Sequence, residues 1–224
     1  MQPLAVILIS IFAAIALALD LAAQPPAMTP TQKEHSKLYK NHGGKKLTEP
    51  DAQGGELIED LLMTVPPETP GEFLRGITCA ADAVVVGTLI SESSALTDDE
   101  TFIFTDYKLR VEEILKRNVA APFQVGADIT VTRPGGTLQL NGRTVREELR
   151  NFRRFRLSGR YLLYLKFIPA TGAYQALGNR SFELRANSFF KLTREQLWHE
   201  SLYKLDSEAA FLEQARKSIA GPCK

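Results

Sequence analysis

The chain has 224 residues, of which 27 are basic and 26 acidic, so its net charge is +1. This length suits one folded domain with appendages, and the proportions of 44% hydrophobic and 24% charged residues exclude a disordered or fibrous chain. The nearly balanced charge also excludes a general attraction of the whole molecule to nucleic acid or to an anionic membrane.

The amino-terminal segment is apolar. Residues 4–19 contain no charged side chain, and Asp20 with the stretch at residues 21–23 follows them. A stretch of this length fits the hydrophobic region of a secretory signal and is somewhat short for a helix that crosses a hydrocarbon core of about 30 Å. We predict a signal peptide over residues 1–23, cleaved after Ala23. The alternatives are an uncleaved anchor through residues 4–19 and a buried core helix. Both signal and anchor place the rest of the chain outside the cytoplasm, secreted or periplasmic.

The next segment, residues 24–75, is predicted to be a flexible tether. It is rich in Pro, Gly, Lys and Gln, which leaves it little apolar surface to bury. Residues 56–63 are an exception, because their leucines share one helical face and predict a short helix. His35 and His42 lie in the tether, where we expect solvated side chains, with a weak metal site as the alternative.

Strand patterns occupy the predicted domain, residues 76–190. The first is a β-branched run, the second alternates apolar with polar residues, and the third is short. These strands are expected at residues 83–90, 102–115 and 128–132. The polar stretch at residues 92–100 is expected to be a loop.

The strongest local signal is a hairpin. Residues 137–140 and 143–145 flank Asn141-Gly142, a pair that favours a type I′ turn because both of its central residues need a positive φ. A hard turn at residues 133–136 precedes this hairpin.

Later segments complete the pattern. Another strand is expected at residues 161–167, and a last pair at 173–177 and 181–184 around Gly178-Asn179.

The carboxyl-terminal segment, residues 191–224, changes to a helical period. A capping box, Thr193-x-x-Gln196, predicts a helix over residues 194–203, and Asp206 caps a second helix that ends before Gly221. Strands followed by helices predict a mainly β fold with terminal helices, all-β or α+β. No Gly-rich turn joins a strand to a helix, which argues against a nucleotide-binding sheet.

Five blocks of this sequence resemble a recurring bacterial secreted module. They are residues 81–87, 107–116, the Gly126-x-x-Ile129-x-Val131 pattern, Pro134-Gly135-Gly136, and residues 155–165. Their order is similar to that of the OB-like barrel in netrin-type and metalloproteinase-inhibitor (TIMP-like) domains, over residues 79–186. The resemblance implies a small OB-like β-barrel, here followed by the two carboxyl-terminal helices.

The inhibitory activity of that family is not implied. In metalloproteinase inhibitors of this type, an amino-terminal cysteine freed by signal cleavage binds the zinc of the target. Here the predicted mature end is Gln24, and Cys79 lies far downstream.

The chain has two cysteines, Cys79 and Cys223, which fit a disulfide in an oxidising compartment. Two free buried thiols are the alternative. Neither cysteine lies in a Cys-x-x-Cys pair or near a His or acidic ligand, which disfavours a metal site or a catalytic thiol.

No motif nominates a catalytic residue, a metal site or a cofactor. The sequence contains neither a His-Glu-x-x-His pattern nor a Gly-x-Ser-x-Gly elbow. The carboxylate pairs at residues 112–113 and 147–148 are adjacent, so on a strand they point to opposite faces. The acidic run at residues 98–100 lacks the spaced oxygen ligands of a calcium loop.

The most unusual feature is basic: residues 143–160 hold seven arginines and two glutamates. Guanidinium groups match phosphate and sulfate oxygens, so a polyanion site is one interpretation. Its candidate ligands are Arg150, Arg153, Arg154 and Arg156. The other interpretation is a solvated, salt-bridged surface. Phe155, within this run, is expected to be a core residue.

The sequence therefore favours an exported, non-enzymatic binding or interaction module without a cofactor. Its expected partner is an extracytoplasmic protein or a polyanion. Export disfavours nucleic acid, and membrane contact is expected only through an uncleaved amino-terminal segment. The alternatives are a polyanion-binding surface protein that uses the basic segment and an enzyme whose site is assembled from dispersed residues.

Overall fold

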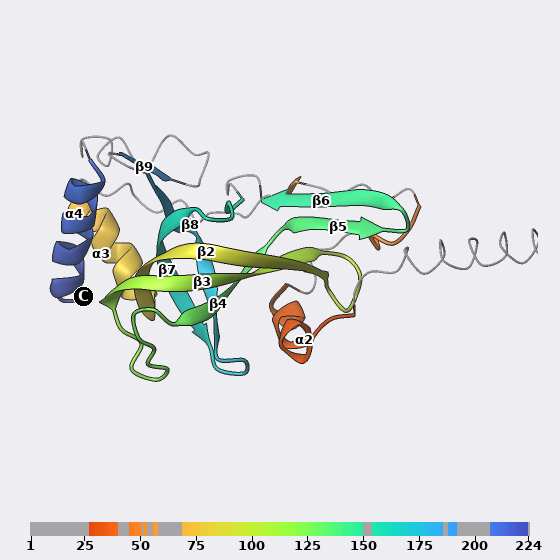
Figure 1. Cartoon of the computed structure of the whole chain (residues 1–224), viewed down its shortest axis with the longest axis horizontal. Coiled ribbons are helices and arrows are strands. Elements are labelled where there is room, and N and C mark those ends of the chain that lie inside the picture. The colour runs from red at the N-terminus through yellow and green to blue at the C-terminus, as the bar shows by residue number, and fades with distance from the viewer. Residues whose placement is uncertain are drawn as a thin grey trace, which may run out of the picture.

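The computed structural model describes residues 27–39, 45–50, 52, 56–57, 69–149, 154–185, 188–191 and 207–223. The fold is mainly β, as predicted, with a large sheet, a smaller sheet and a carboxyl-terminal helix (Figure 1). The predicted signal peptide and the expected helix over residues 194–203 lie outside these ranges. None of the helices within them combines the length and apolar character that a membrane span requires.

The large sheet has six strands in the order β4-β3-β2-β7-β8-β9. Their bounds are β2 Ala83–Leu96, β3 Ile103–Lys116, β4 Asp128–Pro134, β7 Arg160–Ile168, β8 Ala173–Arg185 and β9 Ser188–Lys191. Neighbours in this order are antiparallel. In addition β4 pairs in parallel with β8, which places Val131 opposite Tyr174 and Thr132 opposite Gln175. The first and fifth strands of the order are therefore joined.

Side chains alternate between two cores across this sheet, because successive residues of a strand point to opposite faces. One core gathers residues of β2, β3, β4, β7 and β8 together with Phe155. The other packs against the helices α3 (Pro70–Ala80) and α4 (Glu208–Ala220), where Leu74 and Phe211 are fully buried. The helices thus cover one face of the sheet.

The smaller sheet has the order β1-β6-β5, with bounds β1 Glu56–Leu57, β5 Gly136–Leu140 and β6 Arg143–Leu149. Its β5–β6 ribbon projects away from α3 and α4 in Figure 1. The predicted hairpin is confirmed, since Asn141 and Gly142 have φ values of 51° and 75°.

Two predicted interruptions of strands are wrong. The stretch at residues 92–100 is a loop only at its end, because β2 continues to Leu96 and keeps pairing with β3. Its polar residues Glu92, Ser93 and Ser94 are exposed or partly buried strand positions, and the buried Ala95 and Leu96 follow them. The expected turn at Gly178-Asn179 is absent too, since β8 runs through it and the irregularity is a register shift against β7.

The helices also differ from the expectation. Glu56 and Leu57, which were expected to begin a helix, form β1 beside β6, while the rest of that stretch lies outside the described residues. Of the two expected carboxyl-terminal helices, the first lies outside the described residues, and the second is α4, whose N-cap is Ser207 rather than Asp206.

Two helices that were not predicted lie in or beside the expected tether. These are α2 (Pro30–Ser36), which continues into the short helix η1 (Lys37–Tyr39), and α3. Thr29 and Thr69 each begin a capping box with a proline at the following position. The sequence signal was therefore present, and it is the same one that was used for the helix expected after Thr193.

Candidate functional site

The four candidate polyanion ligands differ in their exposure and in their contacts. Arg150 and Arg153 lie outside the described residues. Arg156 is exposed, whereas Arg154 is partly buried and forms an ion pair with Glu92 of β2. Phe155 is confirmed as a core residue, with 2% of its surface exposed and ring contacts to Tyr107 and Tyr161.

Two further arginines of the basic segment hold the structure together. Arg160 forms ion pairs with Glu112 of β3 and with Glu208 at the start of α4. Arg143 donates to main-chain carbonyl oxygens of the segment that wraps the hairpin, those of Leu47, Glu49, Pro50 and Ala52. Their guanidinium groups are therefore used within the protein.

A small pocket lies where β4 turns into β5. Three arginines line it: Arg133 from β4, Arg146 from β6 and Arg154 from the segment before β7. The pocket is partly open to solvent, and its volume of about 20 Å³ is enough for roughly one water-sized group. We refer to these three side chains and the space between them as the arginine pocket.

Arg133 is the deepest of the three arginines. Its residue is 3% exposed, and its guanidinium carbon lies 4.2 Å from the centre of the Phe155 ring. Stacking a guanidinium on an aromatic face orients the charge and keeps water from one side of it. Sequence reasoning missed Arg133, because the residue stands in the expected turn and outside the Arg-rich stretch.

The pocket also contains carboxylates. Glu147 is 6% exposed, and one of its oxygens accepts a hydrogen bond of 2.6 Å from the Ile103 main-chain NH. Burial raises the pKa of Glu147 from 4.5 to about 7. Glu148 forms an ion pair with Arg146 at the rim. Below pH 7 the lining therefore carries three positive groups against one negative group.

Glycine permits the close approach of strands that forms this pocket. A Cβ at Gly136 would lie 2.4 Å from Thr105 Oγ1 and 2.7 Å from Ser94 Oγ, both closer than atoms can pack. The hydroxyl of Thr105 donates to the Gly135 carbonyl, which fixes the crossing of β5 over β3. The expected hard turn thus brings the pocket walls together.

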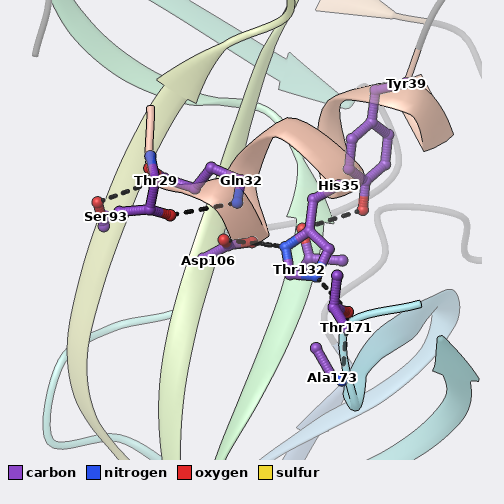
Figure 2. Close-up of polar contacts among 9 residues, drawn as sticks. All are labelled: Thr29, Gln32, His35, Tyr39, Ser93, Asp106, Thr132, Thr171 and Ala173. Carbon is purple, nitrogen blue, oxygen red and sulfur yellow. Dashed lines mark hydrogen bonds and ion pairs between the residues drawn. The ribbon is translucent and has the colours of Figure 1, made fainter. Parts of the chain in front are cut away.

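A second polar cluster lies under α2 (Figure 2). His35 is fully buried, with Nδ1 2.8 Å and 2.9 Å from the two carboxylate oxygens of Asp106 on β3. Its Nε2 lies 2.9 Å from the hydroxyl of Thr171, in the turn between β7 and β8. The expectation of a solvated His35 is therefore wrong, because α2 packs on the sheet. His42 and His199 lie outside the described residues.

The order Asp106, His35, Thr171 resembles an acid–base–hydroxyl relay, in which a base orients and activates a nucleophile. The surroundings favour a structural role. The Thr171 and Gly172 main-chain NH groups both donate to the Ile168 carbonyl, and the Ala173 NH donates to the Thr171 hydroxyl. These donors are thus already used where a reacting group would need stabilisation, and the cluster fastens α2 to the sheet.

Two side chains of the acidic run at residues 98–100 are engaged within the protein. The carboxylate of Asp99 accepts from the hydroxyl groups of Thr97 and Thr101, and Glu100 accepts from Thr48. In the described ranges, no three His, Cys, Asp or Glu residues are grouped so as to hold a metal ion.

Cys79 and Cys223 form a disulfide that joins positions 144 residues apart. It links the last turn of α3 to the chain just beyond α4. Since α3 and α4 pack on the same face of the sheet, the bond fixes that layer.

Comparison with models of known protein families finds no match for this chain, and comparison with curated proteins finds none either. The resemblance to netrin-type and TIMP-like domains therefore stays a prediction.

Proposed function

We propose that this chain is an exported, non-enzymatic binding module that recognises an anionic group at the arginine pocket. The observation that carries this function is the convergence of Arg133, Arg146 and Arg154 on one small pocket. The favoured group is a sulfate, phosphate or carboxylate that places one oxygen inside, because the space holds about one such atom.

The pocket charges support an anion. The Arg133 guanidinium is buried. A nearby negative charge stabilises a buried cation far more than it stabilises an exposed cation. Glu147 in its neutral form is a hydrogen-bond donor rather than a competing anion, so binding should be stronger below pH 7.

We further propose that β2, β3, β4, β7 and β8 form the OB-like barrel that the sequence resembles. The support is the parallel pairing of β4 with β8, which joins the two ends of the five-strand order β4-β3-β2-β7-β8. A closed order leaves these strands without free edges. The pocket then lies at the rim of the barrel, where β4 leaves for the β5–β6 ribbon.

The disulfide supports export, because such bonds persist in oxidising compartments outside the cytoplasm. Expression with the native amino terminus in a bacterial host tests this part. We expect the chain outside the cytoplasm without residues 1–23. An intact membrane-bound chain would support the anchor instead, and an intact chain in the soluble cytoplasm would contradict export.

Retention on immobilised heparin tests the pocket. The variant Arg146→Gln/Arg154→Gln removes two of its positive charges. A matched control is Arg110→Gln/Arg216→Gln, which removes two exposed arginines paired with Asp128 and Glu113 elsewhere on the surface. We expect elution of the pocket variant at clearly lower salt than the control.

Equal loss of retention in the two variants would show that net charge alone governs binding, and would contradict the proposal. Competition by inorganic sulfate separates two sources of the ligand. If free sulfate displaces the protein from the column at a few millimolar, the pocket recognises the ion itself. If it does not, the pocket needs a sulfate ester on a larger chain.

A further inference from the structure

The Cys79–Cys223 disulfide lies at the surface of the protein. Both cysteines are exposed, and so are Ala80 beside the first and Pro222 beside the second. A disulfide opens when a thiolate reaches one of its sulfur atoms, so a buried bond waits for unfolding whereas an exposed bond does not. The position of this bond therefore allows a dissolved thiol to reach it while the protein is folded.

A guanidinium group lies close to the chain on both sides of the bond. Arg75 precedes Cys79 by four residues in α3, so the two side chains lie on the same side of the helix. The Arg75 guanidinium also lies against Gly221, where an added Cβ would be 3.0 Å from Nη2. Gly221 is two residues before Cys223, so one cation borders both cysteines.

A second cation lies at the end of α3. Lys116 of β3 donates to the carbonyl oxygens of Thr78 and Ala81, which lie on either side of Cys79 in the chain, over 2.9 Å and 2.6 Å. Positive groups next to a cysteine favour the thiolate over the thiol. The cysteine that is released when the bond opens is therefore stabilised as a thiolate.

The helical layer has other contacts that hold it to the sheet. Leu74 of α3 and Phe211 of α4 are fully buried, and the ring centroids of Phe211 and Phe182 of β8 are 4.8 Å apart. In addition, Arg216 of α4 forms an ion pair with Glu113 of β3. These contacts do not involve the cysteines, so the layer stays in place when the bond opens.

We propose that the Cys79–Cys223 bond is a modification site of the folded protein, at which a low-molecular-weight thiol forms a mixed disulfide and Arg75 promotes the exchange. The incoming thiolate bonds to one protein sulfur atom, the bond between the cysteines breaks, and the other cysteine leaves as a thiolate. A second thiol then attacks the mixed disulfide, releases the small disulfide and leaves two protein thiols. The two thiol molecules are oxidised and the protein bond is reduced, so no other reactant is needed.

This site is separate from the arginine pocket. It lies on the α3 and α4 layer, from which the β5–β6 ribbon projects away (Figure 1). The inference therefore does not depend on anion binding.

The rate of reduction under native conditions tests whether the bond is reached in the folded chain. The probe is dithiothreitol in excess over the full chain, with alkylation and mass measurement at each time point. We expect the native rate to lie within about 30-fold of the rate in urea-unfolded chain, because the bond is accessible in both states. The native rate should also stay constant as urea rises below the unfolding transition. A native rate below that range, or one that rises in proportion to the unfolded fraction, would overturn the proposal.

Single-cysteine variants test the mixed disulfide itself. Cys79→Ser and Cys223→Ser each leave one thiol, which cannot be released again by its partner cysteine. We expect oxidised glutathione to add one glutathione to each folded variant, and none to the variant that lacks both cysteines. Absence of the adduct in both single variants would overturn the proposal. So would loss of cooperative thermal unfolding in the reduced parent chain, because the site belongs to the folded protein.

Arg75→Gln tests the part that the cation takes in the exchange. We expect the native reduction rate to fall by about threefold or more, because the thiolate loses a positive neighbour. Arg75→Lys should restore the rate, and the matched control Arg110→Gln, which removes an exposed arginine of β3, should not change it. A rate that Arg75→Gln leaves unchanged would contradict the role of Arg75. Heparin retention should be the same in the parent and both single-cysteine variants, so failure here is distinct from failure of the arginine pocket.

Discussion

Side chains in and near the basic segment differ in what each of them contacts. Phe155 is buried between two tyrosine rings, and Arg133 lies on the edge of that cluster at the floor of the pocket. The same aromatic residue therefore supports the core and orients the cation. Its removal should affect stability first and anion binding second.

We expect Phe155→Ala to lower the free energy of unfolding by about 3–5 kcal/mol, because it leaves a cavity in the core. Chemical denaturation of the purified chain measures this change. The control is Leu157→Ala, two residues along the chain, where the side chain is 52% exposed and the expected change is within about 0.5 kcal/mol. Similar losses in both variants would contradict the assignment of Phe155 to the core.

Glu147 should make stability depend on pH. Its pKa is about 7 in the folded chain and 4.5 in the unfolded chain. Between pH 4.5 and pH 7 the folded state therefore keeps a proton that the unfolded state has released. Stability from this group is complete below pH 4.5 and is lost as the pH rises through 7. We expect the parent chain to lose stability relative to Glu147→Gln between pH 5 and pH 8. If the stability curves of the two proteins run parallel over that range, the raised pKa of Glu147 is contradicted.

Residue-level sequence reasoning succeeded where the signal is local. Asn141-Gly142 was predicted as a tight turn because its neighbours in sequence are enough to define it. His35 was missed because its burial depends on Asp106 and Thr171, which are 71 and 136 residues away. No local pattern records such partners. Arg133 was missed because it stands in the expected turn, outside the Arg-rich stretch, and the sequence does not show its contact with the Phe155 ring.

At the scale of elements, local capping signals and strand pairing explain most differences from the expectation. The capping boxes at Thr29 and Thr69 were readable, but the Pro-rich and Gly-rich composition around them was taken as a tether. The extension of β2 to Leu96 was not readable, because polar residues in a strand are favoured only when a partner such as β3 supplies the pairing.

The disulfide belongs to this scale because it joins two elements of one layer. Replacing both Cys79 and Cys223 with Ala should lower the free energy of unfolding by about 3–5 kcal/mol, since the bond restricts a long loop in the unfolded chain. The layer itself should persist, because Phe211, Leu212 and Ala215 of α4 stay buried against the sheet. Circular dichroism of the variant should show parent-like helix content, and loss of that signal would indicate that the bond alone holds α4.

At the scale of the whole molecule, the strand-first, helix-last order predicted a mainly β fold, and the structure confirms it. The closed order of five strands, the position of the β5–β6 ribbon and the packing of α2 on the sheet could not be predicted in detail, because they depend on contacts between distant segments. The anion site that we propose lies at the β4–β5 turn, where the large sheet meets the ribbon. Such a site agrees with the exported interaction module that we propose.

The central claim, that the arginine pocket binds an anion, is tested most directly by amide chemical shifts during a titration with inorganic sulfate. We predict that the largest saturable shifts fall on Gly135, Gly136 and Thr137, which line the pocket, and that Arg146→Gln/Arg154→Gln removes them. Shifts that are absent, that never saturate, or that cluster on surfaces away from the β4–β5 turn would contradict it.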